Sequence, residues 1–214
     1  MFQLVADHNR PILLSRRKKI GKRIFDLVVC AILIPLLLPI LAMCGIAILI
    51  ESPGPIIFRQ WRTGKGGQRF RMFKFRTMVR NAEELKKDLM HLNELTAPDF
   101  KISADPRITR VGGFLRRTSL DELPQIFNVL LADMSIVGPR PTSFRSETYA
   151  LDQTERLEVT PGITGLWQVS GRSEVDFDER VRLDAEYIRK QSFWFDLVII
   201  LRTFSAVFRQ KGAC

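Results

Sequence analysis

The feature that most constrains this chain is an uninterrupted apolar stretch near its N-terminus. Between residues 27 and 50 no side chain is charged, and nearly every position is Leu, Ile, Val, Ala, Met or Cys. A helix of this length can cross a bilayer core of roughly 30 Å, whereas globular cores seldom supply a helix that is apolar on every face. The stretch is too long for a cleavable signal peptide, and no small-residue cleavage site precedes Glu51. We therefore interpret it as a membrane segment, with a buried core helix as the alternative.

Two prolines and two basic clusters bear on how this segment meets the membrane. Pro35 and Pro39 each remove a backbone donor and crowd the preceding turn, so a kink or a break near Pro39 is expected. Lys and Arg mark cytoplasmic flanks, and here they gather on both flanks, at residues 16–23 and 59–71. A helix that enters the bilayer, breaks and leaves by the same face suits both clusters. We favour this re-entrant form over a simple span.

The net charge of the chain narrows the classes of partner. Its 33 Lys and Arg against 23 Asp and Glu give a formal net charge of +10, so an anionic partner is expected. Nucleic acid, acidic lipid and a phosphorylated substrate all fit that charge. Residues 1–23 hold seven basic and one acidic side chain, which is +6 by 7 minus 1. Most of the basic excess therefore precedes the apolar stretch, where it suits contact with anionic membrane lipids.

Histidine and cysteine are too sparse for several kinds of active site. The chain has two histidines and three scattered cysteines, which are too few for a zinc site. Metalloprotease, zinc-finger and thioredoxin-like functions are thereby excluded, and a serine hydrolase would lack its Gly-x-Ser-x-Gly turn. The odd number of cysteines gives no disulfide framework, which fits a reducing compartment.

The 214 residues suffice for one domain with a real core and are too few for two well-packed domains. We divide the chain into a basic membrane-surface segment over 1–22, a membrane segment over 23–50 and a compact cytosolic catalytic domain over 51–214. Within the catalytic domain, strand-like stretches at 56–61 and 69–77 flank a glycine-rich turn and predict a β-hairpin. The predicted fold class is α/β, mostly helical with a small hairpin or sheet.

The spacing of apolar residues that is typical of a helix is clearest near the C-terminus. Apolar residues recur on one face between residues 193 and 208, and Arg202 and Arg209 interrupt them, which argues against a second membrane span. An interfacial amphipathic helix with aromatic anchors fits this pattern, and so does a helix packed on the domain core. A surface helix of mixed charge is expected over 81–95.

Reactive side chains are densest between Arg116 and Pro124. Pro124 suits the first position of a helix, which places Asp121 and Glu122 at the helix entrance. Free backbone N–H groups and the positive end of the helix dipole converge there and suit a carboxylate or a substrate phosphate. The competing interpretation is structural, because Ser119 and Glu122 have the spacing of a capping box.

Two arginines lie in turns that glycine and proline make stiff. Arg140 stands between two prolines in residues 138–141, and Arg172 follows Gly171. An arginine in a rigid turn suits bidentate recognition of phosphate, although a flexible surface arginine is the commoner case. A carboxylate that attacks a phosphate needs such cations, here Arg116, Arg140 and Arg172, together with Mg²⁺, which prefers the oxygen ligands that this chain offers.

Six motifs stand in one order along the chain, together with the proline-containing apolar stretch. They are Lys22-Arg23-Ile24-Phe25-Asp26, Phe73-Lys74-Phe75-Arg76-Thr77-Met78, Ser119-Leu120-Asp121-Glu122-Leu123-Pro124-Gln125, Asp133-Met134-Ser135, Val137-Gly138-Pro139-Arg140-Pro141 and Pro161-Gly162-Ile163-Thr164-Gly165. With them the chain resembles the bacterial monotopic phosphoglycosyl transferases, also called the bacterial sugar transferase family, from about Lys22 to its end. The length is similar to that of the short form, without the additional transmembrane bundle of longer members.

The resemblance implies an enzyme that transfers a sugar 1-phosphate from a UDP-sugar to polyprenyl (undecaprenyl) phosphate and releases UMP. This is the first membrane step in building a surface polysaccharide, such as an exopolysaccharide. The family's nucleophile is the aspartate of the Asp-Glu pair, which maps to Asp121 and would carry a covalent phosphosugar. Glu122 would serve in acid–base chemistry or, with Asp121, in holding Mg²⁺.

Further residues take expected roles from the same resemblance. Arg116, Arg140 and Arg172 match positions expected to hold phosphates, while Lys74 and Asp184 match recurrent polar positions. The re-entrant helix belongs to the family pattern and implies a monotopic protein on the cytosolic face of the bacterial inner membrane, with downstream glycosyltransferases as possible partners.

One departure from the family lies at the helix break. The break is often Ser-Pro in the family, whereas this chain has Leu38-Pro39. Our hypothesis is that the additional Pro35 compensates for the missing serine.

Two other functions remain open at this point. Residues 69–76 interleave basic and aromatic side chains, as a membrane-tethered nucleic-acid binder would, although the glycines of an RNA-recognition strand are missing. A non-catalytic scaffold of a glycan assembly complex is the third hypothesis, and it predicts that Asp121→Asn leaves glycan synthesis intact. The resemblance favours the enzyme and expects no nucleic acid. Neither the transferred sugar nor the oligomeric state follows from the sequence.

Overall fold

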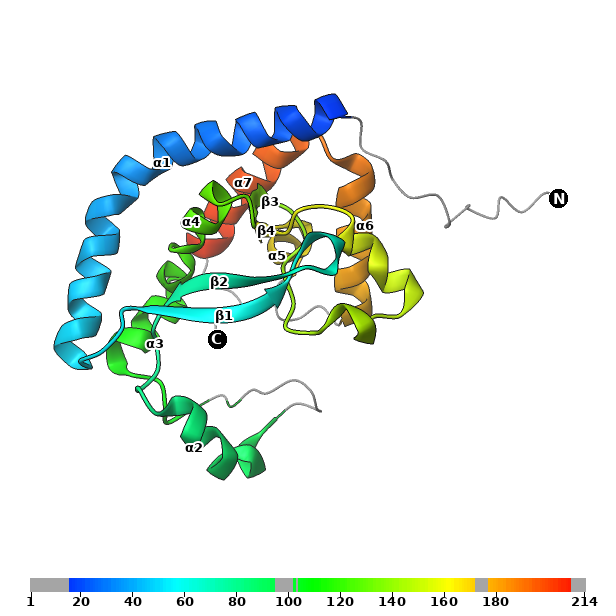
Figure 1. Ribbon diagram of the computed structural model, residues 1–214. Helices are drawn as coiled ribbons and strands as arrows, with labels where there is room; N and C mark the ends of the chain where they lie inside the picture. The colour runs from blue at the N-terminus through cyan, green and yellow to red at the C-terminus, as the bar shows by residue number, and fades with distance from the viewer. Residues whose placement is uncertain (1–15, 95–101, 103, 172–176, 209–214) are drawn as a thin grey trace.

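A computed structural model describes residues 16–94, 102, 104–171 and 177–208. Its first element is the long helix α1 (Arg16–Glu51), which contains Pro35 and Pro39 without ending at either. Figure 1 shows α1 as one bent helix that curves around one side of the domain. A proline removes one hydrogen bond and crowds the turn before it, and here the helix responds by bending. The predicted interruption is therefore a kink within a continuous helix.

The hairpin that the sequence predicts is present. Strands β1 (Ile57–Thr63) and β2 (Arg69–Phe75) pair antiparallel, in a register that runs from Ile57 opposite Phe75 to Thr63 opposite Arg69. The turn between them is a short 3-10 helix, η1 (Lys65–Gly67), in which Gly66 and Gly67 have positive φ angles.

The helix expected over 81–95 is shorter than predicted: α2 (Ala82–Asp88) ends early, and the 3-10 turn η2 (Met90–Leu92) follows it.

The remaining elements build a mostly helical domain behind the hairpin (Figure 1). Two short strands form a second, parallel sheet in which Ser135 pairs with Gly162, and neither strand is predicted from the sequence. The elements are α3 (Arg110–Arg117), η3 (Leu120–Glu122), α4 (Gln125–Leu130), β3 (Ser135–Val137), η4 (Ser146–Thr148), η5 (Leu151–Leu157), β4 (Gly162–Thr164), α5 (Leu166–Ser170), α6 (Phe177–Lys190) and α7 (Phe193–Phe208).

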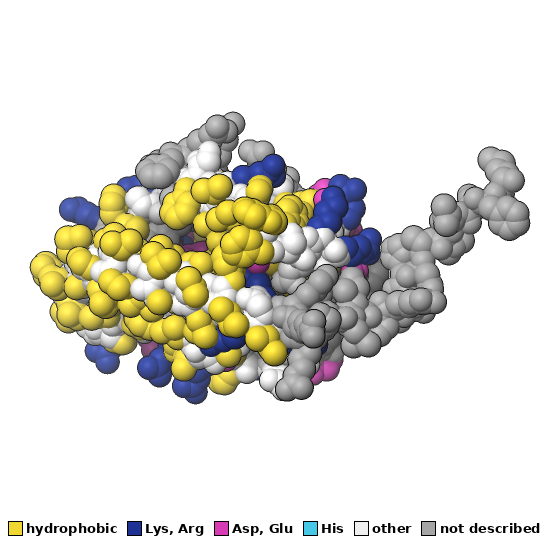
Figure 2. Space-filling model, turned by 90° about the horizontal axis from the view of Figure 1, so that it is seen from above, with side chains coloured by type: hydrophobic (Ala, Val, Ile, Leu, Met, Phe, Trp, Pro, Cys, Tyr) yellow, Lys and Arg dark blue, Asp and Glu magenta, His cyan; other side chains and the backbone are white. Residues whose placement is uncertain are grey.

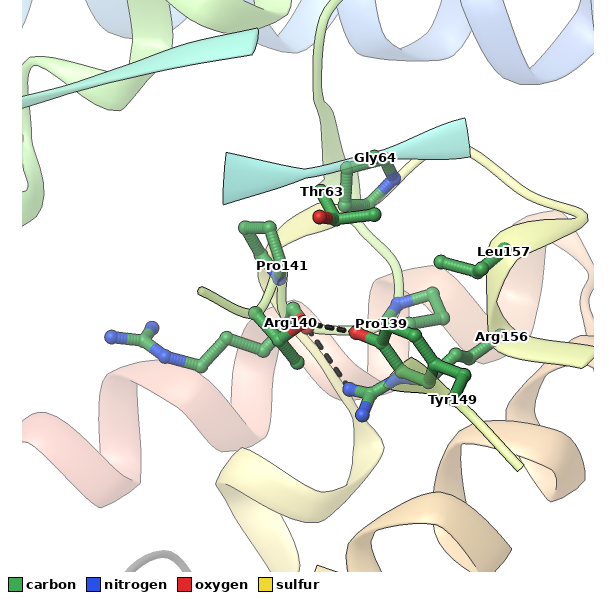
Figure 3. A pocket seen from close by; sticks show the side chains of 10 residues that line it. Thr63, Gly64, Pro139, Arg140, Pro141, Tyr149, Arg156 and Leu157 are labelled. Carbon is green, nitrogen blue, oxygen red and sulfur yellow. Dashed lines mark hydrogen bonds between the residues drawn. The ribbon is translucent and has the colours of Figure 1, made fainter. Parts of the chain in front are cut away.

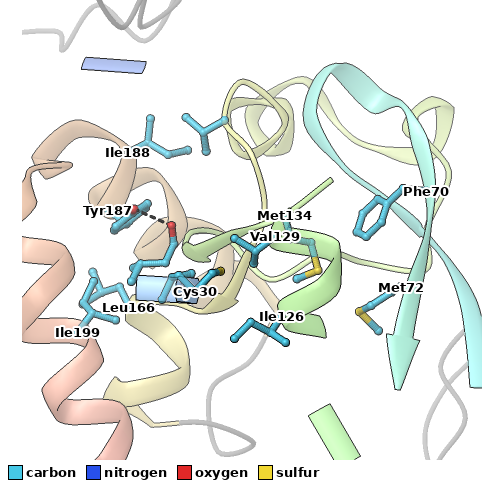
Figure 4. Packing of buried hydrophobic residues seen from close by; sticks show 13 residues of the cluster. Cys30, Phe70, Met72, Ile126, Val129, Met134, Leu166, Tyr187, Ile188 and Ile199 are labelled. Atoms are coloured by element: carbon cyan, nitrogen blue, oxygen red, sulfur yellow. Dashed lines mark hydrogen bonds between the residues drawn. The ribbon is translucent and has the colours of Figure 1, made fainter. Parts of the chain in front are cut away.

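The main hydrophobic core lies where α1, β2, α4, α6 and α7 meet. Cys30 of α1, Val129 of α4 and Ile199 of α7 are fully buried in it, and Met72 and Tyr187 are nearly so. Figure 4 shows these side chains converging from elements far apart in the sequence. Because α1 contributes to this core, the apolar helix and the rest of the domain form one packed unit.

Polar contacts also hold the first turns of α1. The Asp26 carboxylate is 3% exposed and accepts hydrogen bonds from Ser135 Oγ at 2.8 Å and from Lys22 Nζ at 2.7 Å. The same Lys22 Nζ lies 3.1 Å from Asp196 Oδ2 of α7. Arg23 donates to backbone carbonyls at the end of α4. A buried charged group needs such partners, and they fix the angle at which α1 leaves the domain.

The C-terminal helix packs one face on the domain core, as one of its two interpretations expects, and its other face carries the exposed apolar side chains on which the interfacial interpretation depends. Ile199 and Asp196 of α7 are buried against the domain, whereas Trp194 and Leu201 are more than half exposed. Much of α1 is likewise apolar and exposed, and the stretch from Lys19 to Glu51 is long and apolar enough to cross a membrane. Figure 2 shows hydrophobic side chains covering much of the face seen from above. A surface of this kind suits contact with lipid.

Candidate active site

The predicted carboxylate pair lies on the short 3-10 helix η3, between α3 and α4. Ser119 precedes it with φ of +58°, a left-handed backbone conformation that turns the chain sharply. The Ser119 side chain makes no capping hydrogen bond, so the capping-box interpretation is wrong. Pro124 stands immediately before the first residue of α4 instead of occupying that position. The sharp turn leaves Asp121 and Glu122 facing β2 and the segment after β3.

Glu122 is clamped by two cations. Its Oε1 lies 2.9 Å from Lys74 Nζ, and its Oε2 accepts a hydrogen bond of 3.1 Å from Arg140 Nη1. The second guanidinium nitrogen of Arg140 donates to Oε1, so the contact is bidentate. Burial by itself would raise the pKa of Glu122, but the charges of Arg140 and Lys74 hold that pKa well below its ordinary value. Glu122 is therefore an ionised anchor for two cations.

The carboxylate of Asp121 has fewer contacts among the described residues than that of Glu122. It is 8% exposed, and within the described residues no hydrogen bond reaches its side chain. Lys74 Nζ is 3.7 Å from Asp121 Oδ2, which is an ion-pair distance. Burial raises the pKa of Asp121 above its ordinary value, opposed by the nearby positive charges of Lys74, Arg116 and Arg140. A buried carboxylate that lies beside cations and accepts no hydrogen bond from the described residues can act as a nucleophile toward a phosphate.

Arg116 approaches the pair from α3. Its Nε donates to Thr77 Oγ1 at 2.8 Å, and its charge interacts with Asp121. Burial lowers the pKa of Arg116 below the ordinary arginine value, against the attraction of Asp121. Thr77, which orients this guanidinium, was not predicted as a site residue. The structure thus brings Arg116, Lys74 and Arg140 together around the carboxylates, while Arg172 lies outside the described residues.

Asp184 takes no direct part in this cluster. It is fully buried in α6, where its Oδ2 lies 2.7 Å from Arg156 Nη2. Burial raises the pKa of Asp184 to about 7, against the attraction of Arg156. Arg156 Nη2 also donates to the backbone oxygen of Arg140 at 3.0 Å. Arg156 was missed because a single arginine among polar residues of a surface-like stretch has no distinguishing sequence signal.

A small hollow of about 10 Å³ lies behind Arg140 (Figure 3). The Arg140 side chain extends away from this hollow, whereas Pro139, Pro141 and Arg156 line it. The hollow is too small for a nucleotide. A larger cavity of about 150 Å³ lies at the start of α1 and does not include Asp121. Neither cavity encloses Asp121, so the chemistry of the site is argued from this carboxylate and the cations around it.

Whether the site could hold a magnesium ion depends on the carboxylates of Asp121 and Glu122. Among the described residues, no group of three or more His, Cys, Asp or Glu side chains is close enough to hold a metal ion. Magnesium usually takes one or two carboxylates and completes its shell with water and substrate phosphates. Asp121 has one oxygen at an ion-pair distance from Lys74, whereas both oxygens of Glu122 accept hydrogen bonds from cations, so Asp121 is the less occupied of the two carboxylates. The donor set fits a magnesium ion that arrives with a phosphorylated substrate.

Comparisons with known proteins agree on one family. Residues 17–210 match the family described as "Bacterial sugar transferase". The galactosyl transferase CpsE of Streptococcus agalactiae serotype III is 50% identical over 181 residues, which cover 81% of this chain and 40% of CpsE.

Two further relatives carry names that specify a reaction. The undecaprenyl-phosphate galactose phosphotransferase of Salmonella typhimurium is 44% identical over 206 residues, 94% of this chain and 43% of that protein. The UDP-galactose-lipid carrier transferase of Erwinia amylovora is 42% identical over 197 residues, 90% of this chain and 41% of that protein. The chain therefore spans less than half the length of these three relatives.

Proposed function

This chain belongs to the bacterial sugar transferase family, and from that membership we propose that it transfers a sugar 1-phosphate from a UDP-sugar to undecaprenyl phosphate, releasing UMP. The observation that carries the proposal is the buried carboxylate of Asp121, which accepts no hydrogen bond from the described residues and has Lys74 at 3.7 Å and two arginines nearby. Such a site suits attack on a negatively charged phosphate, which an isolated carboxylate would repel. The reaction would initiate a surface polysaccharide.

The proposed transfer has two half-reactions. In the first, an Asp121 oxygen attacks the phosphorus bonded to the sugar, the bond from that phosphorus to the bridging oxygen breaks, and UMP leaves with the electron pair. In the second, an oxygen of undecaprenyl phosphate attacks the same phosphorus and displaces the Asp121 carboxylate. Within the described residues the Asp121 carboxylate accepts no hydrogen bond and has Lys74 at an ion-pair distance, which supports this role because a hydrogen-bonded carboxylate would first have to lose its partners.

The cations around the pair have two tasks in this scheme. Glu122 holds Lys74 and Arg140 in place while no substrate is bound. When a diphosphate enters, its charge competes with Glu122 for both cations, which can then neutralise the transferring and leaving groups. Arg116, held by Thr77, supplies a third positive charge.

Magnesium would add charge neutralisation of the substrate diphosphate when it is bound. Asp121 is the residue able to hold it alongside substrate phosphates, and Glu122 becomes available once a phosphate draws Lys74 or Arg140 away.

The membrane topology belongs to the same proposal. Basic clusters flank the apolar part of α1 on both sides, and the helix bends at a region that contains Pro35 and Pro39. We place both ends of α1 on the cytosolic face of the bacterial inner membrane, so that the helix enters and leaves by one leaflet. This arrangement brings Asp121 to the surface from which the lipid phosphate is reached.

The experiment that tests the proposed function measures UMP release by the purified protein in detergent or nanodiscs. UDP-galactose, UDP-glucose and UDP-amino sugars are supplied in turn with undecaprenyl phosphate and Mg²⁺. UDP-galactose comes first because two relatives carry galactose in their names. Release should require the lipid phosphate for repeated turnover, Asp121→Asn should abolish it, and the exposed control Asp88→Asn should not. Failure with every donor would contradict the proposal.

A further inference from the structure

Arg156 and Asp184 form a charged pair in the interior that the proposed chemistry does not use directly. Their side chains are 5% and 1% exposed, and the distance from Arg156 Nη2 to Asp184 Oδ2 is 2.7 Å. A buried pair is expensive to maintain and often adds little net stability, so its contacts indicate what it holds in place. The same Arg156 nitrogen donates to the backbone oxygen of Arg140 at 3.0 Å.

The segment that carries Arg140 is held on both sides of that residue. Pro139 and Pro141 restrict the backbone, and the Gly162 N–H donates to the Pro139 oxygen at 2.9 Å. Gly138 packs so closely on the chain before β4 that a Cβ there would lie 2.6 Å from the Thr160 oxygen. Among the described residues, Arg156 provides the side-chain contact to the Arg140 carbonyl. Two hydrogen-bonded carbonyls and two prolines thus restrain the backbone from which the Arg140 side chain extends.

The Arg140 side chain extends from this restrained backbone to the carboxylate pair. Figure 3 shows the Arg140 side chain extending away from Arg156, and its guanidinium makes the bidentate contact with Glu122. Resting on the proposed function, we propose that the Arg156–Asp184 pair is a positioning device that aims Arg140 at the transferring phosphate. Asp184 orients the Arg156 guanidinium, Arg156 holds the Arg140 backbone, and Arg140 contacts the substrate. Arg156 and Asp184 act through Arg140 and touch no reacting atom.

Single substitutions come first in the test. Arg156→Met should lower kcat for UMP release by about tenfold and change KM for the UDP-sugar by less, because a misaimed Arg140 weakens stabilisation of the transferring phosphate. Asp184→Asn should act in the same direction and keeps the side-chain shape if Arg156→Met fails to fold. Arg156→Lys should recover part of the loss, since one ammonium can reach the Arg140 carbonyl. Arg182→Met, at an exposed ion pair on α6, is the matched control.

A double-mutant cycle then separates positioning from general structural damage. If Arg156 acts through Arg140, the Arg156→Met loss should shrink from about tenfold to less than about twofold in an Arg140→Gln background. The thermal midpoint of each variant should show that the protein remains folded at the assay temperature. Equal losses in both backgrounds, with an active wild type, would overturn the positioning role alone. A wild type that releases no UMP from any donor would overturn the proposed function and the positioning role with it.

Discussion

At the scale of single residues, two adjacent carboxylates have different tasks because their surroundings differ. Glu122 is bound by Arg140 and Lys74, which hold its pKa low, while Asp121 accepts no hydrogen bond within the described part of the chain and has a pKa raised by burial. Environments that separate the pKa values of neighbouring groups usually indicate separate chemical roles. Here one carboxylate organises cations and the other stays available to react.

Removing the Glu122 charge should disorganise these cations. Glu122→Gln leaves Lys74 and Arg140 close together without their shared anion, so the free energy of unfolding should fall by about 1–3 kcal/mol. UMP release should fall with it, by more than tenfold. The exposed pair of Glu186 with Lys190 is a control, and Glu186→Gln should cost less than about 0.5 kcal/mol. Equal thermal midpoints for the Glu122 and Glu186 variants would contradict the role of Glu122 in holding Lys74 and Arg140.

Asp184 should make stability depend on pH. Its pKa is about 7 in the folded protein against 3.8 as the ordinary value, so the folded state binds the proton more tightly. The stabilisation is therefore complete below about pH 4 and is lost as pH rises through about 7, a change of roughly 2–4 kcal/mol. Asp184→Asn removes this contribution. The thermal midpoint of the wild type should fall relative to that of the variant between pH 5 and 8, and parallel curves would contradict the assignment.

At the scale of elements, sequence patterns predicted what depends on local spacing. The hairpin β1–β2 was predicted from two strand-like stretches joined by a glycine-rich turn, and α7 was predicted from its apolar face. Strands β3 and β4 have three residues each, too few for any periodicity, and they form through contact between distant segments.

The carboxylate pair was predicted from its motif. The two cations that bind Glu122 could not be paired with it from the sequence, because Lys74 and Arg140 meet Glu122 only in the folded chain. The capping-box prediction failed because Ser119 adopts a left-handed backbone.

The prolines of α1 should decide its path through the membrane. Replacing both Pro35 and Pro39 by Ala restores two backbone donors and should straighten the helix, which then becomes able to span. An N-terminal tag on the wild type should be digested by protease only from the cytosolic side, and a fraction of the double variant should become accessible from the opposite side. Pro55→Ala, outside the helix, should behave as the wild type. A wild-type tag reached from the outer side would contradict the re-entrant path.

At the scale of the whole molecule, the apolar helix and the reactive site are parts of one packed unit. Cys30 of α1 is fully buried in the main core, and Lys22 joins α1 to α7 through Asp26 and Asp196. The exposed apolar surfaces of α1 and α7 suit a lipid environment (Figure 2). A domain with a cationic site and exposed apolar helices suits the proposed reaction, in which a water-soluble nucleotide sugar and a lipid phosphate must meet.

The central claim is that Asp121 carries the phosphosugar between the two half-reactions, and capture of that adduct tests it most directly. The purified protein is incubated with UDP-sugar labelled in the phosphate next to the sugar, without lipid phosphate, and is then analysed by intact mass and peptide mapping. We expect one phosphosugar on the peptide that contains Asp121, and this adduct should be lost on addition of undecaprenyl phosphate and absent from Asp121→Asn. A labelled product lipid formed at full rate by Asp121→Asn would contradict it.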